Sequence, residues 1–108
     1  MADGKFTVGQ IGAKFIVKVE EDTLTGHLAY NVTQAEVSAL KILFKTPDRR
    51  TKGPYTAIVR PGTTDEVQFT TTDALLIDID GEWKYRAEIT TTSGDTMKTL
   101  FASEQVVN

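Results

Sequence analysis

Residues 82–92 read EWKYRAEITTT, and this stretch decides the fold class. Every second side chain in its first part is apolar, namely Trp83, Tyr85, Ala87 and Ile89. Charged side chains fill the positions between them, so the two kinds of residue fall on opposite faces of an extended chain. A period of two residues is that of a β-strand with one buried and one solvent-facing side. The stretch therefore predicts a half-buried strand whose apolar face, Trp83 included, lies in the core.

The same alternation recurs along the rest of the chain. It is found in residues 13–21, 28–33, 38–46, 55–60, 66–71, 82–92 and 96–106. Turn-forming sequences such as Lys52-Gly53-Pro54 and Asp80-Gly81 separate these runs. Short strands at regular spacing, with turn residues between them, are typical of a β-sandwich. We therefore expect an all-β fold, an immunoglobulin-like antiparallel β-sandwich of about seven strands.

The length of 108 residues is that of one domain, but the N-terminal segment differs from the rest. In residues 1–12, glycines space out three apolar residues, which are Phe6, Val8 and Ile11. We expect this segment to be either an edge strand or an arm that packs on a neighbouring subunit. Residues 13–108 are expected to form the immunoglobulin-like domain.

Composition and charge exclude several classes of function. The chain has no cysteine, which excludes disulfides, zinc–thiolate sites and a cysteine nucleophile. Its net charge of −3 is opposite to the basic excess of nucleic-acid-binding proteins, so we expect no nucleic-acid partner. No apolar run approaches the ~20 residues of a membrane span, and the first residues lack a secretory signal pattern. We expect no membrane partner and a protein made in a cytoplasm, which can still leave the cell on a particle.

No combination of residues indicates catalysis or metal binding. His27 is the only histidine, and no nucleophile motif accompanies it, so it is interpreted as an exposed loop residue. Residues 78–82 (DIDGE) begin like a calcium loop, but Ile89 stands where such a loop needs its twelfth-position glutamate. The Asp-Gly pair within them instead predicts a tight turn. We therefore expect no enzymatic activity, no catalytic residue, no cofactor and no metal.

Four basic residues surround one turn: Lys45, Arg49, Arg50 and Lys52. The ordinary interpretation is a solvated hairpin tip. The functional alternative is a surface that grips an acidic protein or a phosphate backbone. An acidic protein is the better guess, because no aromatic residue interleaves with these charges as in single-strand nucleic-acid binders. Together with the N-terminal segment, this gives the candidate partner-binding residues Phe6, Val8, Ile11, Arg49, Arg50 and Lys52.

Three stretches, in this order, resemble one family of proteins. Residues 11–21 (IGAKFIVKVEE) resemble the first strand of small immunoglobulin-like domains in tailed-phage virions. Residues 40–48 (LKILFKTPD) resemble an apolar strand of these domains that ends in a Lys-x-Pro-Asp turn, and residues 80–89 (DGEWKYRAEI) resemble their Gly-x-Trp/Tyr strand. The likeness is to the N-terminal domain of phage baseplate upper proteins, and residues 24–36 do not match its pattern.

The resemblance implies a non-enzymatic structural component of a tailed-phage virion, either a tail or baseplate adaptor or a capsid decoration protein. Its partners would be other virion proteins in a symmetric assembly of many copies, and its location would be the virion. The alternative is an adhesion module on the same particle that binds a host glycan or another part of the host surface. Tyr30 and Tyr55 are the aromatic residues available for that role.

Overall fold

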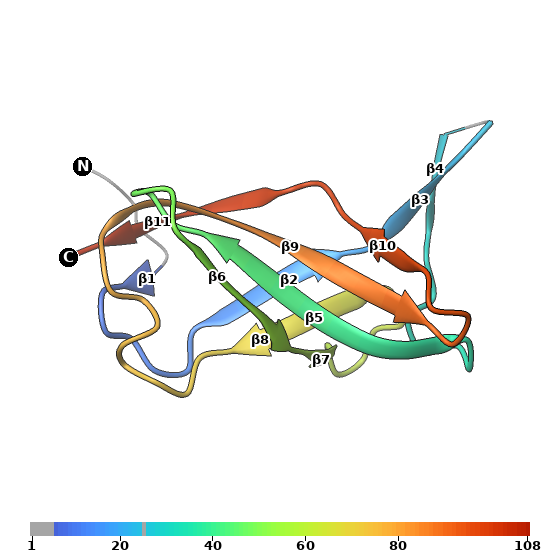
Figure 1. Ribbon diagram of the computed structural model, residues 1–108, viewed down its shortest axis with the longest axis horizontal. Helices are drawn as coiled ribbons and strands as arrows, with labels where there is room; N and C mark the ends of the chain where they lie inside the picture. Colours follow the sequence, from blue (N-terminus) through green and yellow to red (C-terminus); the bar gives the residue numbers. More distant parts are fainter. Residues whose placement is uncertain (1–5, 25) are drawn as a thin grey trace.

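The computed structural model describes residues 6–24 and 26–108 (Figure 1). In this part of the chain every regular element is a β-strand and none is a helix. The strands are β1 (Phe6–Thr7), β2 (Lys14–Lys18), β3 (Glu20–Thr23), β4 (Gly26–Ala29), β5 (Val37–Lys45), β6 (Thr51–Thr56), β7 (Ile58–Val59), β8 (Glu66–Thr70), β9 (Gly81–Thr91), β10 (Thr96–Lys98) and β11 (Ala102–Val107). The predicted all-β fold is confirmed, but the strands are more numerous than seven because several of the expected runs are interrupted.

The strands form one large sheet, one small sheet and a separate hairpin. The large sheet has the order β1-β11-β9-β5-β6, with β10 also paired to β9, and the small sheet has the order β2-β8-β7. All described pairings are antiparallel except one: β1 runs parallel to β11, with Phe6 opposite Val106. The expectation of a purely antiparallel fold is therefore wrong at this edge. No tight turn joins β1 to β11, so nothing forces them to run in opposite directions.

The structure confirms the buried face that was predicted for residues 82–92, which lie in and just after strand β9. Trp83, Tyr85, Ala87 and Ile89 are all buried. The indole Nε1 of Trp83 donates a hydrogen bond to the carbonyl oxygen of Ile79 at 3.0 Å, which satisfies its one buried donor. Burial raises the pKa of Tyr85 to about 12, and the nearby carboxylate of Glu104 adds to this shift.

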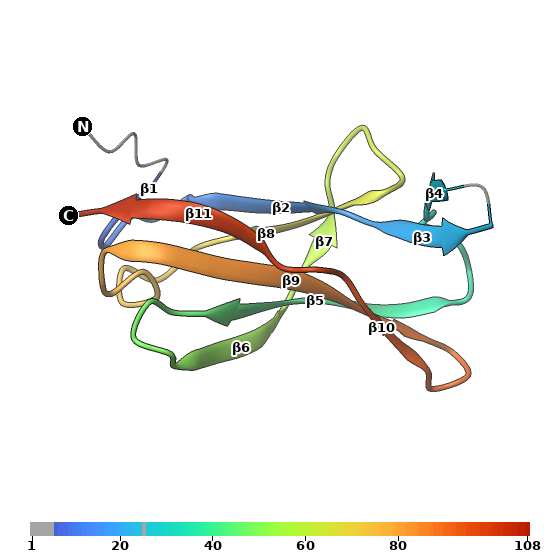
Figure 2. The ribbon, with the colours of Figure 1, turned by 90° about the horizontal axis from the view of Figure 1, so that it is seen from above.

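The buried core draws its residues from both sheets, and Figure 2 shows β2 of the small sheet set apart from β5 of the large one. The ring of Phe15 in β2 lies 4.9 Å from that of Phe44 in β5 and 5.1 Å from that of Tyr85 in β9. Both contacts are edge-on, the arrangement that aromatic pairs prefer. Val67 of β8 and Ile42 of β5 are fully buried beside them. The opposite face of the large sheet therefore faces outward, and its residues form the surface described below.

One of the expected runs is interrupted because the chain changes sheets. Ala57 separates β6, at the edge of the large sheet, from β7, at the edge of the small one, so residues 55–60 do not form one strand. Lys52-Gly53-Pro54, expected as a turn, lies within β6. An edge strand tolerates this sequence because the proline needs no ladder partner. Gly53 has a φ of 90°, and the register of β5 against β6 shifts between Ile42 and Phe44.

Strands β3 and β4 form a hairpin that projects from one end of the molecule (Figure 1). The run 28–33 predicted a strand in which Leu28, Tyr30 and Val32 stand at every second position. In the structure β4 ends at Ala29, Leu28 is 56% exposed, and Val32 is buried beyond the strand. The predicted strand is therefore wrong beyond Ala29. Leu28 is exposed because the projecting hairpin has no second layer of chain against this side chain.

The described part of the N-terminal segment belongs to the chain's own sheet. Phe6 is buried, and its ring lies 4.6 Å from that of Phe15. Beyond β1, the amide of Val8 donates to the carbonyl of Val107 at 2.9 Å, and the amide of Gly12 donates to that of Thr71 at 2.8 Å. Of the two alternatives for residues 1–12, Phe6–Thr7 has the form of an edge strand, and residues 1–5 lie outside the described residues.

Candidate functional site

The turn between β5 and β6 is closed by hydrogen bonds within residues 46–50. The amide of Thr46 donates to the carbonyl of Arg50 at 2.9 Å, and the amide of Arg50 donates to the hydroxyl oxygen of Thr46 at 2.9 Å. The hydroxyl of the buried Thr46 also donates to the carboxylate of Asp48. Arg49 sits at the apex with a φ of 68°, a left-handed conformation that is uncommon for a residue with a side chain. The turn thus divides the basic cluster between two surfaces.

Arg50, which is exposed, and Lys52, which is largely buried, both contact one carboxylate. Nη1 of Arg50 lies 2.9 Å from Oδ2 of Asp78, and Nζ of Lys52 lies 3.2 Å from Oδ1 of the same residue. Lys52 also donates a hydrogen bond of 2.6 Å to the carbonyl of Leu76, and its ammonium lies 5.6 Å from the centre of the Trp83 ring. The hydrogen bond from Arg50, and then that from Lys52, lowers the pKa of Asp78. These two candidate residues are therefore engaged in ion pairs within the chain.

Asp48 completes this network from the turn. Nε of Arg50 lies 2.7 Å from its Oδ2. The hydrogen bond from the Thr46 hydroxyl, followed by the contact with Arg50, lowers the pKa of Asp48. The two aspartates in turn raise the pKa of Arg50 above its ordinary value. The charges of Arg50 and Lys52 are thus balanced by the carboxylates of Asp48 and Asp78. The ion pairs with Asp78 link β6 and the turn before it to the chain before β9, and we call this network the clamp.

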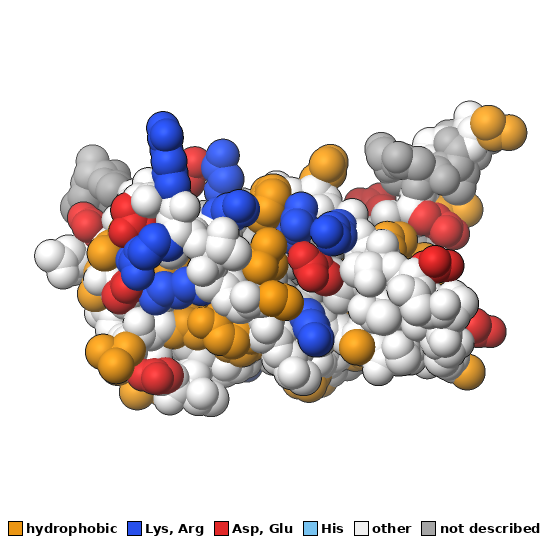
Figure 3. Space-filling view, in the orientation of Figure 1, with side chains coloured by type: hydrophobic (Ala, Val, Ile, Leu, Met, Phe, Trp, Pro, Cys, Tyr) orange, Lys and Arg blue, Asp and Glu red, His pale blue; other side chains and the backbone are white. Residues whose placement is uncertain are grey.

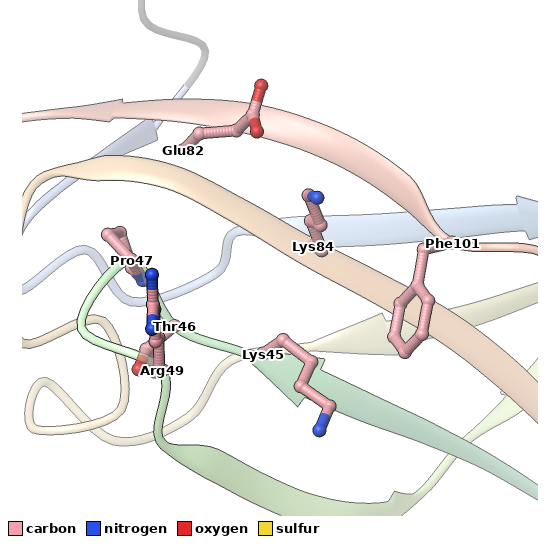
Figure 4. A pocket seen from close by; sticks show the side chains of 7 residues that line it. All are labelled: Lys45, Thr46, Pro47, Arg49, Glu82, Lys84 and Phe101. Atoms are coloured by element: carbon pink, nitrogen blue, oxygen red, sulfur yellow. The ribbon is translucent and has the colours of Figure 1, made fainter.

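Lys45 and Arg49 instead face an open groove of about 580 Å³ on the outer face of the large sheet. The groove is lined by Lys45, Thr46, Pro47, Arg49, Glu82, Lys84 and Phe101 (Figure 4). Figure 4 shows that these side chains come from β5, the turn after it, β9 and the segment before β11. Figure 3 shows the surrounding face, on which Lys and Arg side chains border a strip of apolar ones.

The register of β5 against β9 places two lysines directly opposite each other. Lys45 pairs with Lys84, and both side chains are exposed on the same face. On its other side Lys84 is opposite Ser103 of β11, which carries no charge. Within the described residues neither lysine forms an ion pair. The positive charge of the pair is therefore uncompensated. Like charges in directly opposed positions also destabilise a sheet.

Phe101 forms the apolar end of the groove. Its side chain is 40% exposed, and one face of its ring is covered by Arg86, whose Cζ lies 4.8 Å from the ring centre. Nη2 of Arg86 lies 3.4 Å from Oε2 of Glu88, so this guanidinium is paired within the sheet. The groove therefore combines unpaired cations at one end with an accessible aromatic ring at the other.

A close approach between the turn and β9 shapes the other end of the groove. Gly81 has a φ of 123°, and a Cβ added there would lie 2.7 Å from Cγ of Pro47. Any side chain at this position would displace the turn that presents Arg49. A glycine at the start of β9 thus allows Pro47 to pack directly on the sheet.

The structure separates the remaining candidate residues from this groove. Phe6 is buried, Val8 packs partly against the core, and Ile11 is 63% exposed, but none of the three lines the groove. Sequence reasoning missed Lys84 and Phe101. The alternation of residues 82–92 placed Lys84 on the polar face, but only the strand register shows that it lies opposite Lys45.

A second depression of about 550 Å³ lies beside β6. Tyr55 and Phe69 stack at its border, with ring centres 5.2 Å apart and an interplanar angle of 20°. Thr51, Thr56 and Asp73 supply polar groups around them. Tyr30, the other tyrosine considered for glycan binding, does not line this depression, and all three rings pack partly against the core.

Residues 6–24 and 26–108 bring together no group of three or more His, Cys, Asp or Glu side chains that could hold a metal ion. In the same residues there is no helix of the length and apolar character needed to cross a membrane.

No family model matches the sequence, and neither the curated proteins nor the solved structures contain a match to it.

Proposed function

We propose that this protein is a non-enzymatic structural component of a tailed-phage virion, a tail or baseplate adaptor or a capsid decoration protein, that binds other virion proteins. The observation that carries a binding role is the pair Lys45 and Lys84, two uncompensated cations on paired strands in an open groove. A rigid sheet surface with unmatched charge favours recognition of a partner of opposite charge. The virion assignment is supported by the resemblance of residues 11–21, 40–48 and 80–89 to phage domains.

We also propose that the fold is of the immunoglobulin type. In such domains the third, sixth and seventh strands form one sheet, and the first, second, fifth and fourth form the other. The order β11-β9-β5, with β6 added at the edge, and the order β2-β8-β7 fit this arrangement along the chain. The parallel strand β1 extends the large sheet at its other edge and leaves the central order unchanged.

Labelling of purified particles tests the virion proposal. Gold-coupled antibodies against the folded protein are applied to phage particles from the culture that produces it, and electron microscopy locates the label. We expect label at fixed, symmetry-related positions on the head, neck or tail. The protein remaining entirely in the soluble fraction, with unlabelled particles, would contradict the proposal.

The alternative is a module that binds a host glycan, and the stacked pair Tyr55 and Phe69 favours it. Aromatic rings beside hydroxyl and carboxylate groups are suited to a sugar, which has apolar faces and a polar rim. On this alternative, glycan-array binding is lost in Tyr55→Ala and retained in Tyr30→Ala. No array signal from the unmodified protein would count against it.

A further inference from the structure

We propose that the groove of Lys45, Arg49, Lys84 and Phe101 binds an extended acidic segment of a partner protein. The segment has acidic residues at two alternate positions, followed by an apolar residue at the next alternate position. This inference rests on the proposed binding function and names the chemistry of the partner.

The lysine pair is the first argument for an acidic ligand. Side chains directly opposite each other in an antiparallel sheet have Cβ atoms roughly 4.5–5.5 Å apart, so two ammonium groups repel. The same two strands compensate charge elsewhere, because Lys41 lies opposite Glu88. At Lys45 and Lys84 no such compensation exists in the described residues, and a carboxylate of the partner would supply it.

Arg49 is the second argument. Its exposed side chain lines the groove from the closed turn and forms no ion pair within the described residues, whereas the adjacent Arg50 is bound to two aspartates. A free guanidinium can bind a carboxylate through two parallel hydrogen bonds. Glu82 is the one carboxylate that lines the groove, and Figure 4 shows it extending toward the β11 side.

The spacing along β9 gives the order of the ligand's residues. Glu82, Lys84 and Arg86 follow one another at every second position, and Phe101 lies over Arg86. Alternate residues of an extended chain are about 6.6–6.8 Å apart, so a segment lying along β9 matches this period. Its first carboxylate meets Arg49, the second meets the lysine pair, and the apolar side chain meets the open face of Phe101.

An acidic protein is a better occupant than a nucleic acid. A phosphate backbone carries a charge at every nucleotide and binds chiefly through a basic excess spread over the protein surface, which a net charge of −3 does not supply. The proposed segment carries two charges and needs only the cations of the groove. The groove also holds one carboxylate, Glu82, which a row of phosphates would have to approach. The test below includes a single-stranded nucleic acid, so that its binding to the groove would be detected.

The test uses the full chain and a synthetic, end-blocked peptide of sequence Glu-Ala-Glu-Ala-Leu. Backbone amide shifts in nuclear magnetic resonance spectra follow the titration at low salt, with the Gln-Ala-Gln-Ala-Leu peptide as control. We expect shifts around Lys45, Arg49, Lys84 and Phe101 and a dissociation constant of about 1 mM. Added salt should weaken binding because the charges are exposed.

Two matched variants decide whether the groove is responsible. Lys84→Glu should weaken binding about fivefold to tenfold, since it exchanges an attraction for a repulsion. Lys14→Glu makes the same charge change on the exposed face of β2 and should alter binding by less than about twofold. Lys84→Arg, which keeps the charge, should bind like the unmodified protein.

Three results would overturn the inference: no shift in the groove, equal binding of the glutamine peptide, or equal weakening by Lys14→Glu. Tighter binding of oligothymidylate at the same residues would assign the groove to a nucleic acid instead. Peptide binding without labelled particles would leave this inference standing and overturn the virion function. Labelled particles with no peptide binding would overturn this inference alone.

Discussion

The ammonium nitrogen of Lys52 lies 3.2 Å from Oδ1 of Asp78, which joins β6 to the chain that leads into β9. The Lys52 side chain is largely buried, with 16% of its surface exposed, and its ammonium nitrogen lies 5.6 Å from the centre of the Trp83 ring. The sequence places Lys52 in an exposed basic cluster, but in the structure its side chain lies at the edge of the core. Lys52 is therefore not available to a partner. The contribution of its ion pair can be tested by measuring the free energy of unfolding of variants.

Removing Lys52 should destabilise the fold. Lys52→Ala removes the ion pair with Asp78 and leaves the carbonyl of Leu76 without its hydrogen-bond donor, and the loss of such a hydrogen bond costs about 1–3 kcal/mol. Urea unfolding followed by the fluorescence of Trp83, the single tryptophan, measures the change. Arg49→Ala is the control and should stay within about 0.5 kcal/mol, because its side chain is exposed and forms no ion pair in the described residues. Equal losses in the two variants would contradict the clamp.

The same network predicts a dependence of stability on acid pH. The pKa of Asp78 lies below its ordinary value of 3.8 in the folded protein, so the unfolded chain binds this proton more readily. The stability that Asp78 contributes is complete above that ordinary value and is lost as the pH falls through the lower pKa of the folded state.

In Asp78→Asn this contribution is absent, so the free energy of unfolding should be lower near neutral pH and should fall less steeply in acid. Urea midpoints measured from about pH 2 to pH 7 give the comparison. Asp80→Asn removes an exposed carboxylate outside the network and serves as the control. An unchanged acid slope in Asp78→Asn would show that the ion pairs do not stabilise the fold.

A side chain at position 81 should disturb the turn that presents Arg49. In Gly81→Ala the new Cβ would lie 2.7 Å from Cγ of Pro47, on a backbone with a φ of 123°. We expect a loss of at least about 2 kcal/mol in the free energy of unfolding. Adding Pro47→Ala should recover part of the loss, because it relieves the contact but not the backbone strain. A neutral Gly81→Ala would contradict this account.

The described N-terminal residues should contribute to stability. Phe6 is buried against Phe15, so Phe6→Ala should cost about 3 kcal/mol through lost contacts and a cavity. Ile11→Ser, at a position that is 63% exposed, should change stability by less than about 0.5 kcal/mol. Thermal unfolding followed by circular dichroism compares the two. A mild effect of Phe6→Ala would mean that β1 is not integral to the fold.

The lysine pair should lower stability in the free protein. Lys84→Glu turns the repulsion with Lys45 into an attraction and should raise the free energy of unfolding by about 0.3–1 kcal/mol. Lys84→Gln, which only removes a charge, should give a smaller gain. A stabilising change that weakens peptide binding is the pattern of a residue kept for binding. A lower urea midpoint for Lys84→Glu would contradict the repulsion.

Local sequence predicted the buried face of β9, whose alternation identified its four core residues. In β5 the alternate residues Ile42 and Phe44 are buried, but Leu43 on the other face is buried as well. In the hairpin of β3 and β4, Leu28 is exposed because the hairpin stands apart from the core. Alternation describes two faces of a strand, and it does not say whether anything packs on either face.

Less of the candidate site than of the fold could be predicted from the sequence. Arg49 and Lys45 were recognised as part of a basic turn, and Lys84 was recognised as exposed. Their union in one groove depends on the register of β5 against β9, which a shift of one residue would abolish. The ion pairs of Arg50 and Lys52 depend on Asp78, which lies far along the chain.

The sequence by itself determined an all-β chain, a single domain's length, the buried face of its longest strand and the absence of cysteine chemistry. These properties follow from residue type and a period of two, which are local. The tertiary structure alone decided the parallel pairing of β1, the separation of the basic cluster into a clamp and a groove, and the opposition of Lys45 to Lys84. Each of these depends on which distant strands pair and in what register, and that choice is made by the packing of the whole core.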